Sequence, residues 1–239
     1  MIYLCQREGG VTVSRTRNEK RHLVTLMNSH SPVSEAYRAL RTHIEYSVVD
    51  NPAQIIMITS AGREEGKSTV AGNLAVVYAQ NERRVLLIDA VLRKPAVHRM
   101  FQVSSPAGLS SLLSHQIDLE DAVQETGIPH LYVMTSGPIP PNPAELLGSE
   151  KMKELLEQLR TQFDIILIDT PPLLAVTDAQ LLASQSDGVL LVMHAGKVRK
   201  EIAVKAKENL QRVNARLLGV VLNKVKRKTS EKYYYYYGN

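Results

Sequence analysis

Ten residues, 60–69 (SAGREEGKST), combine glycine, lysine and hydroxyl side chains at a spacing that binds phosphate. They follow an apolar run and open a helical pattern, a setting in which backbone N–H groups and the helix N-terminus receive phosphate oxygens. Lys67 would neutralise charge on the β- and γ-phosphates, and the Ser68 hydroxyl would reach Mg²⁺. Ala61 stands where the usual GxxxxGK[ST] pattern has its first glycine. The predicted nucleotide-binding residues of this loop are Gly62, Glu65, Gly66, Lys67, Ser68 and Thr69.

Two aspartates that end later apolar runs complete the predicted site. Asp89 closes RVLLID and Asp169 closes FDIILID. Carboxylates at the carboxyl ends of parallel strands face the crevice where such sheets bind ligands. With Ser68, two of them beside a phosphate loop suit Mg²⁺ that keeps several waters, although each aspartate alone is also consistent with a helix cap. Asn223 ends the last apolar run. Either its side-chain amide meets the nucleotide base, or the residue belongs to an ordinary turn that ends the strand.

The elements that must position these residues alternate along the chain. Short, continuously apolar runs are typical of strands buried on both faces, and they occupy 54–60, 84–89, 131–136, 163–169, 188–194 and 217–223. Helical patterns lie near 67–81, 118–125, 149–161, 178–186 and 199–213, with further helices opening at Ser31-Pro32 and near Ala144. This alternation predicts an α/β fold with a doubly wound, mostly parallel sheet and helices on both faces.

Composition indicates one domain with basic ends. The chain has 239 residues, 44% of them apolar, and a net charge of +5, which suits one domain with tails. Residues 1–30 carry a net +3 and residues 224–239 a net +4, which leaves −2 for 31–223. We therefore expect a basic arm over 1–30, a nucleotide-binding domain over 31–223, and a basic tail over 224–239. The basic ends either aid solubility or contact an anionic membrane or acidic partner.

Some function classes are excluded at this stage. The single cysteine, Cys5, rules out a disulfide scaffold and a multi-cysteine metal site. No stretch reaches the ~18 apolar residues of a membrane span, and the first residues lack the apolar core of a secretion signal. We expect a soluble, cytoplasmic protein.

Further motifs accompany the phosphate loop. They are SPVSEAYRALRTHIEY (31–46), LLIDAVLRKP (86–95), TSGPIPPNPAELL (135–147), LIDTPP (167–172) and five consecutive tyrosines near the C-terminus. The loop and LIDTPP alone indicate only the wider P-loop NTPases of MinD- and ParA-like type. Together, over about residues 31–239, the motifs resemble the bacterial tyrosine kinases (BY-kinases), in particular the separate cytoplasmic kinase subunit of Gram-positive capsule and exopolysaccharide systems.

The resemblance implies phosphoryl transfer from ATP to tyrosine with Mg²⁺ as cofactor. Lys67 and Ser68 would then hold the phosphates and metal, while Asp89 and Asp169 would organise the metal. Asp89 would also accept the tyrosine proton, and Arg93 would balance the charge of the transferring phosphate. Such a reaction needs mostly positioning and charge neutralisation. The phosphate acceptors implied on a neighbouring subunit are Tyr233, Tyr234, Tyr235, Tyr236 and Tyr237.

The resemblance also implies an assembly. Glu35, Arg38 and Arg41 are spaced by three in the helix after Ser31 and run along a similar side. From spacing alone they form a solvated face; in the family pattern they join subunits into a ring, commonly an octamer. The implied partners are the cytoplasmic tail of a membrane polysaccharide co-polymerase, which would hold the kinase at the inner face of the cell membrane, and other tyrosine-containing proteins. No nucleic-acid partner is expected.

One departure from the family pattern bears on activity. The pattern has a second acid two residues after the first, and here that position is Val91. A valine neither binds Mg²⁺ nor takes a proton, so we expect intact nucleotide binding and weakened transfer. Two alternatives stay open. One is a MinD- or ParA-like ATPase, but that group has a signature lysine early in the loop, and this chain has Gly62 at that position. The other is a regulatory subunit that binds nucleotide without catalysis.

Overall fold

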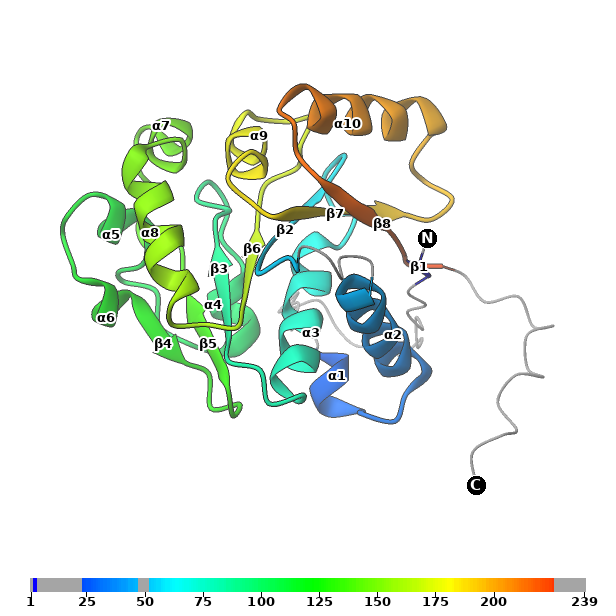
Figure 1. Ribbon diagram of the computed structural model, residues 1–239, viewed down its shortest axis with the longest axis horizontal. Coiled ribbons are helices and arrows are strands. Elements are labelled where there is room, and N and C mark those ends of the chain that lie inside the picture. The colour runs from blue at the N-terminus through cyan, green and yellow to red at the C-terminus, as the bar shows by residue number, and fades with distance from the viewer. Residues whose placement is uncertain (1, 4–22, 47–51, 226–239) are drawn as a thin grey trace, which may run out of the picture.

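An eight-stranded sheet lies between two layers of helices in the computed structural model, which describes residues 2–3, 23–46 and 52–225 (Figure 1). The strand order is β1-β8-β7-β2-β6-β3-β5-β4. Neighbouring strands are parallel except β4 and β5. The strands are β1 (Ile2–Tyr3), β2 (Ile55–Ser60), β3 (Val85–Asp89), β4 (Val123–Glu125), β5 (Leu131–Met134), β6 (Ile165–Asp169), β7 (Gly188–His194) and β8 (Leu217–Asn223).

Successive strand residues face two separate cores. In β2, Ile55 and Met57 enter one core, whereas Ile56 and Ile58 enter the other, as the two-residue period of a strand dictates. The second core is covered by α1 (Val24–Met27), α2 (Pro32–Tyr46), α3 (Lys67–Ala79) and α4 (Val97–Phe101). The first is covered by α5 (Leu109–Leu113), α6 (Leu119–Ala122), α7 (Pro143–Leu147), α8 (Glu150–Arg160), α9 (Asp178–Ala183) and α10 (Lys200–Arg212). Helices on both faces of a mostly parallel sheet confirm the predicted fold class.

Helix α3 is the central support of the second core. Eleven of its 13 residues are buried, so it has almost no solvent face, and small residues allow close neighbours. At Gly72 a Cβ atom would lie 2.1 Å from Sδ of Met100 in α4. The helix that begins at the phosphate loop is thus held on nearly all sides by the core.

Three parts of the chain differ from the sequence prediction. The helix expected over 118–125 is a short α6 followed by β4, because the last residues pair antiparallel with β5 at the sheet edge. Helices α4 and α5 were not predicted, since five residues are too few for a periodic pattern. Within the segment expected to be an arm, α1 packs on α3, with Thr25 buried and bonded to Asn73. Residues 1, 4–22 and 226–239 lie outside the described residues.

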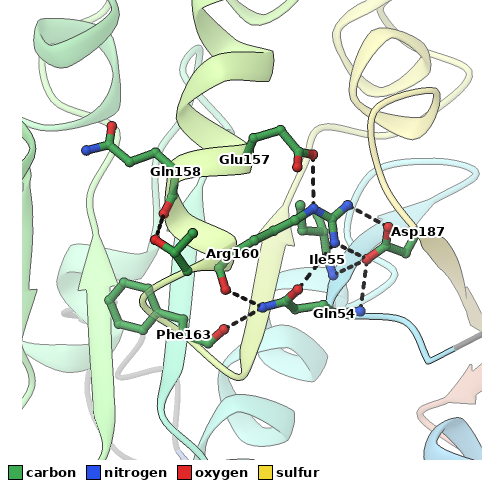
Figure 2. Close-up of polar contacts among 8 residues, drawn as sticks. Gln54, Ile55, Glu157, Gln158, Arg160, Phe163 and Asp187 are labelled. Carbon is green, nitrogen blue, oxygen red and sulfur yellow. Dashed lines mark hydrogen bonds and ion pairs between the residues drawn. The ribbon is translucent and has the colours of Figure 1, made fainter.

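A polar cluster fixes the sheet at its amino-terminal edge (Figure 2), and the phosphate loop follows β2 at the opposite edge. Arg160, at the end of α8, donates two hydrogen bonds to Asp187, at 2.6 and 2.7 Å. The Asp187 carboxylate also accepts the backbone N–H groups of Gln54 at 2.9 Å and Ile55 at 2.7 Å. Exposed Glu157 adds a 3.0 Å contact to the guanidinium. The first residues of β2 are therefore tied to α8 and to the start of β7.

Candidate nucleotide and phosphoryl-transfer site

The phosphate loop spans residues 61–66, between the end of β2 and the start of α3. Gly66 takes a left-handed conformation, with φ of 94°, and its carbonyl accepts the first helical hydrogen bond of α3 from Val70 at 2.9 Å. A Cβ atom on Gly66 would lie 2.0 Å from Nδ2 of Asn223. Only glycine meets both the backbone conformation and this close approach, so the sequence pattern places its second glycine where the fold requires it.

The loop is braced by its own side chains. The Ser60 hydroxyl donates to the Gly62 carbonyl at 2.6 Å, and the Glu65 carboxylate accepts the Gly62 N–H at 2.6 Å. Glu65 is buried, and this burial raises the pKa of its carboxyl, while backbone N–H groups and the charge of Lys197 act in the opposite direction. The loop thus holds a buried carboxyl group close to the groups expected to receive phosphate.

The end of β8 closes over the loop from the other side. Asn223 is buried and its amide donates to the Glu65 carbonyl at 3.0 Å. Lys224, whose φ is 58°, donates from Nζ to the Glu64 carbonyl at 3.1 Å. Asn223 therefore supports the loop itself, a role that neither of its two sequence interpretations included. Lys224 was not predicted, although its place directly after a strand end was the available signal.

Lys67 and Asp169 meet at the mouth of the loop. The Lys67 ammonium lies 3.6 Å from Oδ1 of Asp169 and donates to the Ser68 hydroxyl at 3.1 Å. The Asp169 side chain is completely buried at the end of β6, and the Lys67 side chain is 15% exposed. These two contacts fix the position of the Lys67 ammonium, and phosphate binding requires a positive charge that is positioned in this way. The structure brings these three residues together at the start of α3.

Asp89 lies at the end of β3, directly beside Asp169 in the sheet register. Its Oδ1 accepts the Val91 N–H at 3.1 Å, and its Oδ2 accepts the N–H groups of Ala96 and Val97 at 2.8 Å. The carboxylate therefore also caps α4, one of the two roles that its position allows. Burial raises the pKa of Asp89, whereas the three N–H donors and the charge of Lys67 lower it.

The segment after Asp89 contains Arg93 and Val91, the two remaining residues that the sequence analysis singled out near the site. Arg93 forms a forked ion pair with Asp178 at the start of α9, with contacts of 3.1 and 3.2 Å. The Asp178 side chain is fully buried, and its hydrogen bond raises the pKa of Arg93. Asp178 was missed in the sequence, because the two residues are 85 positions apart. Val91 is 7% exposed and contributes an apolar side chain where the related pattern has an acid.

The three residues expected to join subunits lie on α2. Glu35 and Arg38 pair with each other, and Arg38 also donates to the Ser29 carbonyl at 2.7 Å. Arg41 donates to the Val77 carbonyl of α3 at 3.3 Å and lies 3.9 Å from Glu45. Within one chain, Arg41 is mostly engaged with its own fold, and Glu35 is the most exposed of the three. The five terminal tyrosines lie outside the described residues.

The oxygen donors at the loop suit a hard cation. Ser68 and Asp169 present a hydroxyl and a carboxylate on adjacent elements, the ligand types that Mg²⁺ takes together with substrate phosphates. In the described part of the chain, no group of three His, Cys, Asp or Glu side chains is placed to hold a metal ion. Over the same residues, no helix is long and apolar enough to span a membrane.

Comparison with known proteins points in the same direction as the geometry. Residues 53–218 match a family model described as an AAA domain. The tyrosine-protein kinase YwqD of Bacillus subtilis is 48% identical over 223 residues, which are 93% of this chain and 94% of that protein. The crystal structure of the chimerical protein CapA2B2 matches with a TM-score of 0.83 and 40% identity, over 86% of this chain and 90% of that one.

Two further solved structures show which fold this chain shares. The kinase domain of the Escherichia coli tyrosine kinase ETK matches with a TM-score of 0.88 and 33% identity, over 99% of this chain and 94% of that one. The cell division ATPase MinD of Pyrococcus furiosus matches less closely, with a TM-score of 0.62 and 29% identity over 74% of each chain. The MinD-like P-loop fold predicted from the sequence is confirmed, and this fold implies nucleotide binding.

Proposed function

Because this chain belongs to the bacterial tyrosine-protein kinases, we propose that it transfers the γ-phosphoryl group of ATP to the C-terminal tyrosines of a neighbouring copy. We further propose that this reaction regulates capsule or exopolysaccharide synthesis. The observation that carries the proposal is the Lys67 ammonium, held between the Ser68 hydroxyl and the buried Asp169 carboxylate at the mouth of the phosphate loop.

The loop residues bind and orient the triphosphate. Backbone N–H groups of the loop and of the first turn of α3 receive phosphate oxygens, and Lys67 neutralises charge that develops between the β- and γ-phosphates. Ser68 and Asp169 would hold Mg²⁺, with Asp89 in an outer position because its oxygens already accept three N–H groups. When bound, Mg²⁺ supplies charge neutralisation on the phosphate oxygens.

Asp89 receives the proton of the tyrosine hydroxyl. Its Oδ1 accepts a single hydrogen bond, from Val91, and so keeps a free acceptor site. The phenol oxygen forms the new bond to the γ-phosphorus as the bond to the ADP oxygen breaks, and the phenol proton passes to Oδ1. Burial raises the pKa of Asp89 and thus improves it as an acceptor. Arg93 stabilises this segment through Asp178 and contributes positive charge near the transferring group.

Val91 reduces the rate without preventing nucleotide binding. It removes one acid from the segment that faces the phosphates, whereas the loop and Lys67 are unaffected. The alternative of a regulatory subunit without catalysis rests on this same residue, so the Val91→Asp variant decides between the two.

The proposed setting is a cytoplasmic, ring-shaped oligomer at the inner face of the membrane. Glu35, Arg38 and Arg41 on α2 would contact the next subunit. The cytoplasmic tail of a membrane polysaccharide co-polymerase would activate the kinase, and other tyrosine-containing proteins would be further substrates. The likeness to the chimerical CapA2B2 supports association with a second, activating polypeptide. No role for nucleic acid is proposed.

Mass spectrometry of the C-terminal peptide after incubation with MgATP and the activator tail tests this function. We expect phosphate on residues 233–237 of the unaltered chain, none in Lys67→Ala, and about ten-fold faster transfer in Val91→Asp, at the low end of acid–base contributions. Phosphate only in Val91→Asp would support a silent subunit instead. An unmodified tail in all three proteins, with nucleotide bound, would overturn the proposal in favour of an ATPase.

A further inference from the structure

The phosphate loop contains a residue in a strained backbone conformation. Glu64 has a φ of 61°, in the left-handed region that side chains other than asparagine and aspartate rarely adopt. Gly66, close behind it, is left-handed too, with a φ of 94°, but glycine meets this conformation without steric cost. Strain at a functional site persists only where the surrounding structure holds it in place. The contacts of Glu64 therefore decide how the loop keeps its shape.

The left-handed residues matter for phosphate binding because they direct the backbone groups of the loop. The chain turns at residues 63 and 64, directly before Glu65 and Gly66. Backbone segments in which turn and left-handed residues follow one another bring successive N–H groups to one side, where they form a concavity for an anion. The carbonyl groups of the same residues then point away from that side. The direction of the Glu64 and Glu65 carbonyls therefore controls how the loop presents its N–H groups.

Both of these carbonyls are held from the end of β8. The Lys224 ammonium donates to the Glu64 carbonyl at 3.1 Å, and the Asn223 amide donates to the Glu65 carbonyl at 3.0 Å. Each donor is far from its acceptor in the chain, by 160 and 158 residues, so the loop sequence itself does not supply this support. The contact from Lys224 is charge-assisted, a class of hydrogen bond that is stronger than a neutral pair.

The two donors are themselves fixed in place. The Asn223 carbonyl accepts the Ala195 N–H at 2.9 Å, which ties the end of β8 to the residue that follows β7. Oδ1 of Asn223 accepts the Lys224 N–H at 2.9 Å, and Lys224 has a φ of 58°, so the chain turns at this residue. In the sheet, β7 lies between β8 and β2, the strand that leads into the loop (Figure 1). The Lys224 side chain thus reaches the loop from a strand end that the sheet holds rigidly.

These contacts assign a role to Lys224. We propose that Lys224 is a positioning residue of the nucleotide site: its ammonium holds Glu64 in the left-handed conformation, and this keeps the N–H groups of the loop directed at the phosphates. In this role Lys224 acts through the loop and is not itself a catalytic residue. The inference rests on the proposed function, because it requires that the loop binds the phosphates of ATP, and it adds a residue that lies outside the loop motif.

Loss of the Lys224 ammonium should weaken phosphate binding and spare the rest of the nucleotide. We expect Lys224→Met, which keeps an unbranched side chain, to bind ADP about ten-fold more weakly in calorimetry, the ratio for roughly one hydrogen bond. Adenosine has no phosphate, so its affinity, measured by competition, should change less than about two-fold. Lys224→Arg retains a charged donor and should stay within about three-fold of wild type for ADP. An equal loss for ADP and adenosine would overturn the proposal, because the phosphates would then not be involved.

Substitutions of Glu64 separate support of the backbone from the effect of charge. Glycine adopts a positive φ freely, so Glu64→Gly in the Lys224→Met chain should recover most of the lost ADP affinity. Glu64→Ala is the matched control, because it removes the same carboxylate but keeps a Cβ atom, and it should recover less than about two-fold. Equal recovery by the two substitutions would show that charge near the loop, and not the conformation of Glu64, carries the effect. That result would also overturn the proposal.

Kinetics of phosphoryl transfer separate this inference from the proposed function. The loop holds the phosphates both before and during transfer, so Lys224→Met should raise KM for ATP about ten-fold and leave kcat within about two-fold of wild type. An unchanged KM, or a lowered kcat in its place, would refute the positioning role and leave the kinase intact. If no chain transfers phosphate while ADP and adenosine binding follow the expected pattern, the kinase proposal fails and the role of Lys224 stands.

Discussion

Removing the carboxylate of Asp187 should destabilise the fold without touching the nucleotide site. The Asp187→Ala change removes the acceptor of four hydrogen bonds, two from Arg160 and two from the first residues of β2. It leaves two backbone N–H groups without their acceptor at the amino-terminal edge of the sheet, and the Arg160 guanidinium keeps only the carboxylate of exposed Glu157. The opposite edge, which contains the phosphate loop, keeps every contact.

The expected loss follows from charge and exposure. Hydrogen bonds to charged groups contribute about 1.5–3 kcal/mol each, and breaking a fully buried pair costs about 3–5 kcal/mol. Both side chains here are 25% exposed, so water replaces part of the interaction. We expect about 2–3 kcal/mol, which lowers Tm by roughly 5–10 °C in a chain of this size.

The pH dependence of the difference has a defined sign. Burial alone would raise the pKa of Asp187, but the Arg160 hydrogen bonds and the N–H groups of Ile55 and Gln54 lower it below its usual value. A depressed folded-state pKa gives stability that is present above about pH 4, the unfolded value. The gap between wild type and Asp187→Ala should therefore be constant near neutral pH and shrink as the pH falls below about 4.

Urea unfolding and calorimetry across pH 3–8 measure both quantities. Glu157→Ala is the matched control, because this glutamate contacts the same guanidinium but is 70% exposed, and it should cost less than ~0.5 kcal/mol. Equal effects of the two variants, or a gap that widens on acidification, would refute the argument. Nucleotide affinity should be unchanged in both variants.

Three further changes test the site. Gly66→Ala should weaken nucleotide binding at least about 100-fold in a fluorescent-nucleotide titration, because it strains a positive φ and clashes with Asn223; near-normal affinity would show that the loop adapts freely. Asn223→Ala loses the bond to the Glu65 carbonyl and should weaken binding about ten-fold, roughly one hydrogen bond; binding above wild type would contradict a supporting role. Arg93→Ala leaves the buried Asp178 without its guanidinium and should lower stability by about 1–2 kcal/mol, discounted for exposure; an unchanged Tm would mean that the pair contributes nothing.

The strands and the phosphate loop were predictable because their signals are local. A run such as RVLLID is apolar throughout since both faces of β3 are buried, and the loop's glycines and lysine are adjacent in the chain. The alternation of such runs with helical patterns is enough to give a doubly wound sheet. Local chemistry also placed Asp89 and Asp169 at strand ends, and the sheet register shows that these two strands are neighbours.

What the sequence did not predict depends on contacts between distant segments. The amide of Asn223 meets Glu65 158 residues away, and Arg93 meets Asp178 across 85 residues. The segment 123–125 becomes a strand because β5 offers a free edge to pair with, which outweighs local helical preference. Helix α4 exists partly because Asp89 accepts its first N–H groups, a cap supplied by a residue outside the helix.

The burial of α3 predicts how mutations are tolerated across the domain. Because the helix that begins at Lys67 is enclosed by the core, most substitutions along it require repacking of two or three neighbouring elements. Nucleotide affinity should therefore be adjustable mainly through loop residues 61–66, the first three residues of α3 and the end of β8, whereas changes in the rest of α3, residues 70–79, should lower the yield of folded protein. A saturation scan that sorts variants by abundance and by nucleotide binding should show residues 70–79 in the first group and residues 61–69 in the second.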